Sequence, residues 1–212
     1  MPATSITQLA IANPDHTISS PALQDIFKFV KTTLQEGTKN PVFLLHQLED
    51  PTAIYLVSQW DTIAQHADYI PSAGGKSLSQ KWAGALEFKW SIHLDGPISA
   101  LPFAKEEIKK DLVFSLTRQH LRPGSRDEFY KAFESKKGIL EEYVTEGEIG
   151  YLLRSDPPKD GEEVEEMVLC CPWKAPEQHQ GFQGVERFGE FVGTIAPFFK
   201  EVDVKHVKLL GV

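Results

Sequence analysis

The sequence predicts an α+β protein of two tandem halves, each with the element order β-α-β-β-α-β. The first observation is a spacing that occurs twice: a Trp is followed by a His six residues later and by an aromatic residue three further on. The two copies are Trp60, His66 and Tyr69, and Trp173, His179 and Phe182. The second observation is that the segments around both copies share one order of apolar runs and helical patterns, which indicates an internal repeat.

The first half shows alternating strand and helix patterns. In order, the expected elements are strand Ser5–Asn13, helix Ser20–Gly37, strands Val42–Pro51 and Ile54–Trp60, a helix after Thr62, helix Lys76–Ala85 and strand Leu86–Leu94. Ser20 can cap the long helix, Pro21 suits its first turn and Gly37 suits its end. The predicted buried face carries Ile26, Phe27, Val30 and Leu34. Thr62 and Gln65 fit a capping box for the next helix.

The second half repeats this order. Its expected elements are strand Leu112–Leu121, helix Ser125–Gly147, strands Ile149–Pro158 and Met167–Cys171, a helix with Pro176 in its first turn, helix Val185–Phe199 and strand Val202–Leu210. The predicted buried face of the long helix carries Phe129, Phe133, Leu140 and Val144. This half is seven residues longer between the Asp-Pro turn and the Trp, and the extra residues fall in the acidic loop KDGEEVEE, where a hairpin tolerates insertion.

The strands predict how the halves fold. Runs such as IYLVSQW and MVLCC are almost continuously apolar, which is typical of a sheet covered on both faces. Helices cover one face of such a ferredoxin-like half, so the other face requires a second sheet. We therefore expect halves at about 1–97 and 108–212, joined by a linker over Asp95–Glu106, to pack sheet to sheet. They would form an intramolecular pseudo-dimeric α/β barrel, and the protein is expected to be a monomer or a weak homodimer.

Composition excludes several classes of partner. The net charge of −8 argues against nucleic acid and against an anionic membrane surface. No apolar run reaches the roughly 18 residues of a membrane span, and the start MPATSITQLAIANPDH does not read as a secretory signal. The only cysteines, Cys170 and Cys171, are neighbours on a strand and cannot build a disulfide framework or a metal cage. A cytoplasmic location is expected.

These elements resemble the dimeric α/β-barrel superfamily, in its antibiotic-biosynthesis-monooxygenase-like branch. The resemblance rests on the β-α-β-β-α-β half with Trp60 ending the third strand and His66 in the next helix, repeated at Trp173 and His179. It covers nearly the whole chain as two fused copies. The superfamily includes cofactor-free monooxygenases, polyketide cyclases, haem-degrading enzymes and proteins without known activity, so the resemblance implies a fold more firmly than a function.

The repeated Trp and His each have a structural and a functional interpretation. Trp60 and Trp173 can plug a strand-to-helix corner or form an aromatic wall for a planar substrate. His66 and His179 can bond a backbone carbonyl, or act as general bases kept neutral near a helix N-terminus. Repetition favours a structural corner, with chemistry in at most one copy.

Other polar residues differ between the halves and are the more informative candidates. His93 lies in the last strand of the first half with Trp90 three residues earlier, and His46 lies mid-strand where the second half is apolar. Aligned on their last strands, the halves place His206 opposite Trp90, which leaves His93 unmatched. Arg118 and His120 lie on the first strand of the second half. Polar groups in a doubly covered sheet are costly unless bonded, which makes these residues site candidates.

Recognisable cofactor motifs are absent from the sequence. It has no dinucleotide or phosphate-binding loop, no nucleophile elbow and no two-His-one-carboxylate helix. Haem-degrading relatives use an Asn on the first strand, but Asn13 precedes Pro14 and fits a turn better. We therefore expect no metal and no organic cofactor.

Two functional hypotheses follow. In the first, the protein is a small-molecule enzyme that acts on an aromatic or polyketide-like substrate, as a monooxygenase or a cyclase, with a His as general base. The expected pocket lies between the helices and the sheet of the first half. His93 is the first choice of base and His66 the second, Tyr69 could donate to an oxyanion, and substrate contacts are expected from Trp60, Trp90, His46, Arg118 and His120. In the second hypothesis, a non-catalytic or stress-type barrel only holds a ligand.

Overall fold

The structure, a computed structural model, describes residues 1–108, 111–158 and 164–212. The chain divides into two compact units, Met1–Ile98 with Lys208–Val212, and Ser99–Val207. Each unit is described by itself. Most of the extra residues expected in the acidic loop, 159–163, lie outside the described part of the chain. Within that part, no helix has the length and apolar character needed to cross a membrane.

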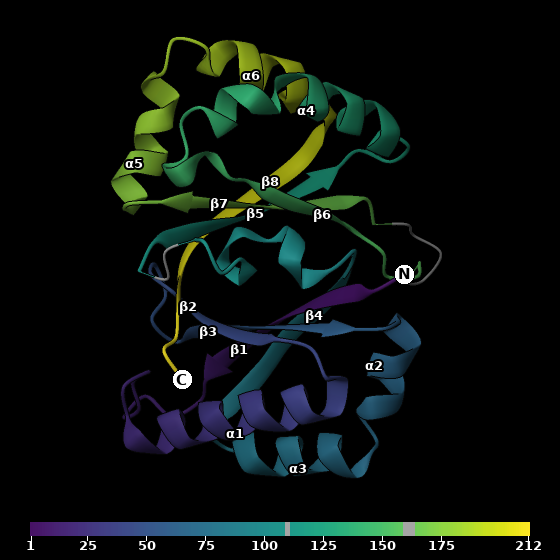
Figure 1. The fold of residues 1–212 in the computed structure, drawn as a ribbon, viewed down its shortest axis with the longest axis vertical. Coiled ribbons are helices and arrows are strands. Elements are labelled where there is room, and N and C mark those ends of the chain that lie inside the picture. Colours follow the sequence, from purple (N-terminus) through teal and green to yellow (C-terminus); the bar gives the residue numbers. More distant parts are fainter. Residues whose placement is uncertain (109–110, 159–163) are drawn as a thin grey trace. The chain divides into compact units, whose positions relative to one another are not determined.

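The first unit has the predicted element order. It contains β1 (Ala3–Ile11), α1 (Pro21–Thr38), β2 (Val42–Gln47), β3 (Ala53–Trp60), α2 (Ile63–Tyr69), α3 (Ala73–Trp82) and β4 (Leu86–Asp95). β1 pairs with both β3 and β4, and β2 pairs with β3, so the antiparallel strand order is β4-β1-β3-β2. Figure 1 shows α1 and α3 together on one face of this sheet.

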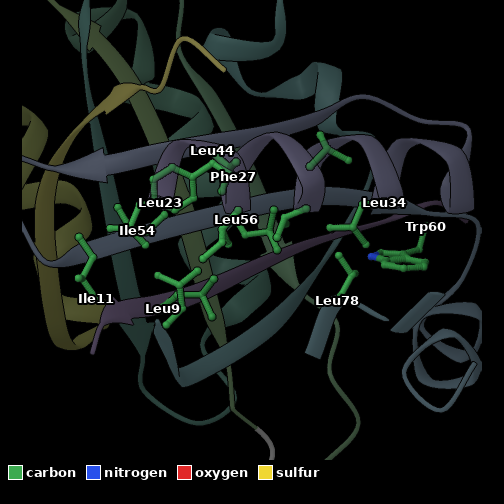
Figure 2. Packing of buried hydrophobic residues seen from close by; sticks show 14 residues of the cluster. Leu9, Ile11, Leu23, Phe27, Leu34, Leu44, Ile54, Leu56, Trp60 and Leu78 are labelled. Carbon is green, nitrogen blue, oxygen red and sulfur yellow. The ribbon is translucent and has the colours of Figure 1, made fainter. Parts of the chain in front are cut away.

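A hydrophobic core fills the space between α1 and the sheet of the first unit. Pro21 starts α1 as predicted, whereas the Ser20 hydroxyl accepts from the backbone N–H of Thr17 instead of capping the helix. The predicted apolar stripe is confirmed, since Ile26, Phe27, Val30 and Leu34 are all buried. Figure 2 shows this cluster, with Trp60 at one end beside Leu34 and Leu78.

The second unit has the same order of principal elements. It contains β5 (Val113–Leu121), α4 (Arg126–Glu141), β6 (Gly150–Arg154), β7 (Glu166–Trp173), α5 (Pro176–Gly181), α6 (Phe188–Ile195) and β8 (Phe199–Leu209), the last of which extends past the unit boundary at Val207. Short 3-10 turns lie at Ile98–Ala100, Pro102–Ala104, Thr145–Gly147, Phe182–Gly184 and Ala196–Phe198. The antiparallel strand order is β8-β5-β7-β6, so β5 takes the place that β1 has in the first unit. The α+β class is confirmed.

The segment expected to be a simple linker is largely part of the core of the second unit. Leu101 and Phe103 are fully buried, and the Phe103 ring meets Phe114 edge to face at 5.9 Å between centroids. A Cβ at Gly150 would lie 2.1 Å from the carbonyl oxygen of Ala100, so only glycine lets β6 approach this segment. The apolar sequence LPFA explains this packing, because two large side chains are removed from water.

Candidate functional site

The site begins at the last residue of β3, where Trp60 is almost completely buried. Its indole nitrogen donates to the Ser58 hydroxyl at 3.0 Å and lies 3.4 Å from the Ser5 hydroxyl. These two hydroxyls are themselves 3.0 Å apart, on paired positions of β3 and β1. A buried indole N–H needs a partner, so the two serines hold the ring in one orientation.

Helix α2 starts directly after Trp60 and places His66 over the indole. The Thr62 hydroxyl caps the helix by accepting from the Gln65 N–H at 3.1 Å, as predicted. The Gln65 side chain reaches one residue further back than a capping box requires and accepts from the N–H of Asp61 at 2.6 Å. The His66 ring stacks on Trp60 with 4.3 Å between centroids and 12° between planes. The imidazole is thus fixed by the corner that the Trp forms.

The second imidazole of the site comes from β4. His93 lies opposite Ser5 of β1, and its Nε2 is 2.7 Å from the Nδ1 of His66. One of these nitrogens donates and the other accepts. When both rings are neutral, the pair therefore carries one further N–H and one further lone pair on its two outer nitrogens, His66 Nε2 and His93 Nδ1. Such a pair can take up one proton and share the resulting charge.

The histidine pair lies on the wall of a cavity of about 370 Å³ between the helices and the sheet of the first unit. This volume falls in the range of small-molecule sites. The wall is mainly apolar, with the imidazoles and several hydroxyls as its polar groups. Its residues are Ser5, Thr7, Leu34, Leu56, Ser58, Trp60, Ile63, His66, Ala67, Tyr69, Ile70, Gly75, Leu78, Ser79, Trp82, Phe88, Ser91 and His93.

Two large apolar side chains of the wall are exposed and mark its solvent side. Ile70 is 60% exposed and Phe88 is 59% exposed. The pairing of β1 with β4 shifts between Gln8 and Leu9, because Trp90 pairs with Gln8 while Phe88, not Lys89, pairs with Leu9. This bulge turns Phe88 onto the face that also carries Ser91 and His93. Bulges re-aim side chains in this way next to functional sites.

Tyr69 contributes its ring to the wall, but its hydroxyl bonds elsewhere. The ring lies 5.1 Å from the Trp60 ring. The side chain fills space left by two glycines, since a Cβ at Gly37 would lie 2.6 Å from the ring and a Cβ at Gly74 would lie 2.7 Å from the hydroxyl oxygen. The hydroxyl donates to the carbonyl oxygen of Thr33 at 3.4 Å. Burial, followed by the charge of Glu36, raises the pKa of Tyr69. The expected oxyanion-donor role of Tyr69 therefore does not fit this geometry.

Two other predicted contacts of the first unit lie away from the cavity. Trp90 stands between Ser91 and Lys89 on β4, and strand alternation directs it to the opposite face, where its ring meets Tyr55 at 6.1 Å. His46 lies on β2, separated from β4 by two strands, or roughly 14 Å at the usual strand spacing. Burial, more than Lys208, lowers the pKa of His46. Neither residue is part of the cavity wall.

Arg118 and His120 belong to an ionic cluster of the second unit. The Glu166 side chain is fully buried and receives Arg118 Nε at 2.5 Å and Arg154 Nη1 at 3.1 Å. His120 Nδ1 lies 3.7 Å from the same carboxylate, and Arg154 Nε reaches Asp156 at 2.7 Å. The structure thus brings these two predicted residues together in one cluster. The positive charges of the two guanidinium groups compensate the negative charge of the buried carboxylate.

The second unit repeats the Trp–His–His geometry. The Trp173 indole stacks on His179 at 4.5 Å and 11°, and His179 Nδ1 lies 2.9 Å from His206 Nε2. His206 faces Ser115 as His93 faces Ser5. The alignment that placed His206 opposite Trp90 is therefore wrong, and His93 is not unmatched. Each residue of the second set lies 113 positions after its counterpart (173 − 60, 179 − 66 and 206 − 93).

The surroundings of the second pair differ from those of the first. Cys171 replaces Ser58 on the strand that ends in Trp, so the Trp173 indole donates to Ser115 at 2.9 Å. The Tyr143 ring lies 6.3 Å from Trp173 and 5.3 Å from Phe182. Burial, then the neighbouring His206, lowers the pKa of His179 to about 4. Burial raises the pKa of both Cys170 and Cys171, so these thiols stay protonated at neutral pH.

The hydroxyl groups and Trp82 of the cavity wall, and the pairing of His206, were not predicted from the sequence. The two Trp residues are 113 positions apart, and the residue 113 positions after His93 is His206. The alternation of Ser5 with Thr7, and of Ser91 with His93, was a second available signal, because such residues share one strand face. In the part of the chain that the structure describes, no group of three His, Cys, Asp or Glu residues could hold a metal ion.

Comparison with known proteins adds information on the fold. No family model and no curated protein matches the chain. Among solved structures, it is similar to a candidate monooxygenase of Fusobacterium nucleatum subsp. nucleatum, with a TM-score of 0.66, 12% identity and coverage of 99% of this chain and 92% of the other. An anthrone oxidase-like protein matches with a TM-score of 0.66, 11% identity and coverage of 99% and 91%. A candidate monooxygenase of Lactobacillus acidophilus gives a TM-score of 0.59 at 11% identity, covering 98% and 93%. At these identities the likeness shows a shared fold.

Proposed function

We propose that the protein is a cofactor-independent small-molecule monooxygenase whose base is the His66–His93 pair. The observation that carries this proposal is the pair itself, hydrogen-bonded at 2.7 Å on the wall of an apolar cavity of about 370 Å³. A general base needs a lone pair, a fixed orientation and a site with little water. When both rings are neutral, one outer nitrogen of the pair carries a lone pair. Stacking on Trp60 fixes the orientation of His66, and the mainly apolar wall limits water.

The substrate class is an electron-rich fused aromatic, such as an anthrone. Its flat shape suits a wall that contains Trp60, Tyr69, Trp82 and Phe88. An anthrone-type substrate also agrees with the likeness to an anthrone oxidase-like protein, and that likeness favours oxygenation over ring closure.

The reaction follows from the acidity of such a substrate. The pair removes a proton from the carbon opposite the carbonyl, with His93 as first choice and His66 as its partner. The resulting carbanion bonds to one oxygen atom of O₂, and the peroxide takes up the proton. Loss of water then breaks the O–O bond and leaves a second carbonyl. One anthrone and one O₂ thus give one anthraquinone and one water, without an external reductant.

The test is oxygen uptake with anthrone in the presence of a chelator. We expect consumption of one O₂ for each anthraquinone formed, at a rate that increases linearly with protein concentration. If aromatic ligands bind but oxygen uptake stays at the rate without protein, the proposal is overturned in favour of a ligand-binding barrel. If the protein instead converts a polyketide-like substrate into a ring-closed isomer without consuming oxygen, the proposed monooxygenase activity is replaced by a cyclase activity.

The finer architecture is part of the same proposal. We propose that the two units are fused copies of one ancestral unit, with boundaries near 1–97 and 108–212, and that they pair as a pseudo-dimeric barrel. The common offset of 113 residues for Trp, stacked His and strand His supports duplication. Analytical ultracentrifugation tests the oligomeric part: we expect a 23.8 kDa monomer or a weak dimer, and an obligate dimer at all concentrations would contradict it.

A further inference from the structure

Two hydroxyls of the cavity wall form a second polar point besides the histidine pair. Thr7 Oγ1 and Ser91 Oγ lie 2.8 Å apart on paired positions of β1 and β4. In a bond between two hydroxyls, one donates its hydrogen and the other accepts. The accepting hydroxyl therefore keeps its own hydrogen, and both oxygens keep acceptor capacity. The pair can donate to, or accept from, one oxygen atom of a ligand in the cavity.

The other hydroxyl pair of the wall has a structural task. Ser5 and Ser58 bind the indole nitrogen of Trp60. The second unit retains this task, because Ser115 accepts from Trp173. The hydrogen bond between a serine hydroxyl and the Trp indole is thus present in both units, so it is explained by the Trp corner without a ligand.

The Thr7–Ser91 pair is found in one unit alone. Thr117 occupies the place of Thr7 in the second unit, but its partner across the sheet is Val204, which stands 113 residues after Ser91. The second unit therefore keeps the imidazole pair and loses the hydroxyl pair. A hydroxyl pair that the Trp–His–His geometry does not require, and that lies on the cavity wall, fits recognition of a ligand.

We infer that Thr7 and Ser91 form a subsite for an oxygen of the substrate, so that the ligand is a flat aromatic with an oxygen function at the end remote from the group that faces the imidazole pair. Ser91 and His93 are two residues apart on one face of β4, or about 7 Å at the rise of a strand. One end of the ligand then faces the imidazole pair while the other meets the hydroxyl pair. This inference rests on the proposed function for the identity of the cavity as the substrate site.

Binding of naphthols tests the subsite without turnover. Isothermal titration calorimetry compares 2-naphthol with 2,6-dihydroxynaphthalene, which adds an oxygen at the far end of the same ring system. We expect the second hydroxyl to tighten binding to the unaltered protein by about 2- to 10-fold, as one added hydrogen bond does. Ser91→Ala and Thr7→Val should remove this gain, so that the two naphthols bind each variant with Kd values within about 2-fold of each other, and Thr7→Ser should restore the gain.

The matched control is Thr117→Val, which removes the corresponding hydroxyl of the second unit and should keep the full gain. The inference is overturned if the gain persists in Ser91→Ala and Thr7→Val, if the unaltered protein shows no gain, or if neither naphthol binds. The proposed function fails separately. If the binding pattern holds while anthrone is not oxidised, the subsite stands and the monooxygenase assignment falls.

Discussion

The Nδ1 of His66 lies 2.7 Å from the Nε2 of His93, although 27 residues of chain separate them. The same two atoms of His179 and His206 lie 2.9 Å apart, again with a separation of 27 residues. Both helix histidines stack on a buried Trp. The imidazole pair is therefore a property of the repeated corner, and the Thr7–Ser91 hydroxyl pair beside it distinguishes the first unit from the second.

Replacing His93 should abolish most of the proposed activity. In His93→Ala, we expect the rate of anthrone oxidation to fall by about 10²- to 10⁴-fold, because the general base and the orientation of His66 are both lost. The matched change His206→Ala removes the same atoms from the second pair and should leave the rate within about 3-fold. Initial oxygen uptake at saturating anthrone measures both, and the melting temperature verifies folding. Equal losses in two folded variants would show that the first pair has no special role.

Phe88 should control access of the substrate. It is 59% exposed and still part of the cavity wall. In Phe88→Ala, we expect KM for anthrone to rise by about 3- to 20-fold with little change in kcat, since the contact is made in ground and transition states alike. Because the ring is exposed, the melting temperature should change little. A fall in kcat at unchanged KM would instead place Phe88 at the reacting carbon.

The sequence was sufficient to predict the order of elements and the buried faces of the long helices. Periodicity reports burial directly, as Phe27 and Phe133 illustrate, both fully buried. The spacing from Trp60 to His66 was also sufficient to place the two rings near each other. A capped helix that begins directly after a strand leaves the backbone between them little conformational freedom.

The pairing of His66 with His93, and the parts of Trp90 and Tyr69, could not be predicted from local pattern. Strand register decides which residues face each other, and a one-residue slip moves every side chain to the other face. Aligning the last strands by their ends placed His206 opposite Trp90, and that error hid the second pair. The bulge at Lys89 adds a local shift that no periodicity predicts. The direction of the Tyr69 hydroxyl depends on Gly37 of α1, which is far away in sequence, as well as on the nearby Gly74 of α3.

Arg118 should matter for stability and not for the substrate. Its guanidinium is bound to the fully buried carboxylate of Glu166, which Arg154 also contacts. We expect Glu166→Gln to lower the free energy of unfolding by about 3 kcal/mol, because it leaves two guanidinium groups without their shared counter-charge. Urea denaturation monitored by circular dichroism measures this.

The variant Arg118→Gln separates the two interpretations of that residue. A structural role predicts a lower unfolding free energy with KM for anthrone unchanged within about 2-fold. Recovery of part of the loss in the double variant Arg118→Gln with Glu166→Gln would show that the two side chains are coupled. If KM for anthrone rises in Arg118→Gln while the melting temperature equals that of the unaltered protein, Arg118 contacts the substrate and its role is not structural.

The second histidine pair should make the protein sensitive to mild acid. Burial and the neighbouring His206 lower the pKa of His179 to about 4, compared with about 6.5 for an unfolded histidine. The unfolded chain therefore binds more protons at this position than the folded chain does between these two values. The contribution of His179 to the stability of the folded protein is fully present above pH 6.5 and is lost progressively as the pH falls toward 4.

We expect the melting temperature to fall over this interval, and to fall less steeply in His179→Gln, which keeps a polar side chain but cannot titrate. Scanning calorimetry at pH 7.5, 6, 5 and 4.5 compares the two slopes. Identical slopes in two proteins that are both folded at pH 7.5 would contradict the prediction, because a residue that titrates alike in both states adds no pH dependence.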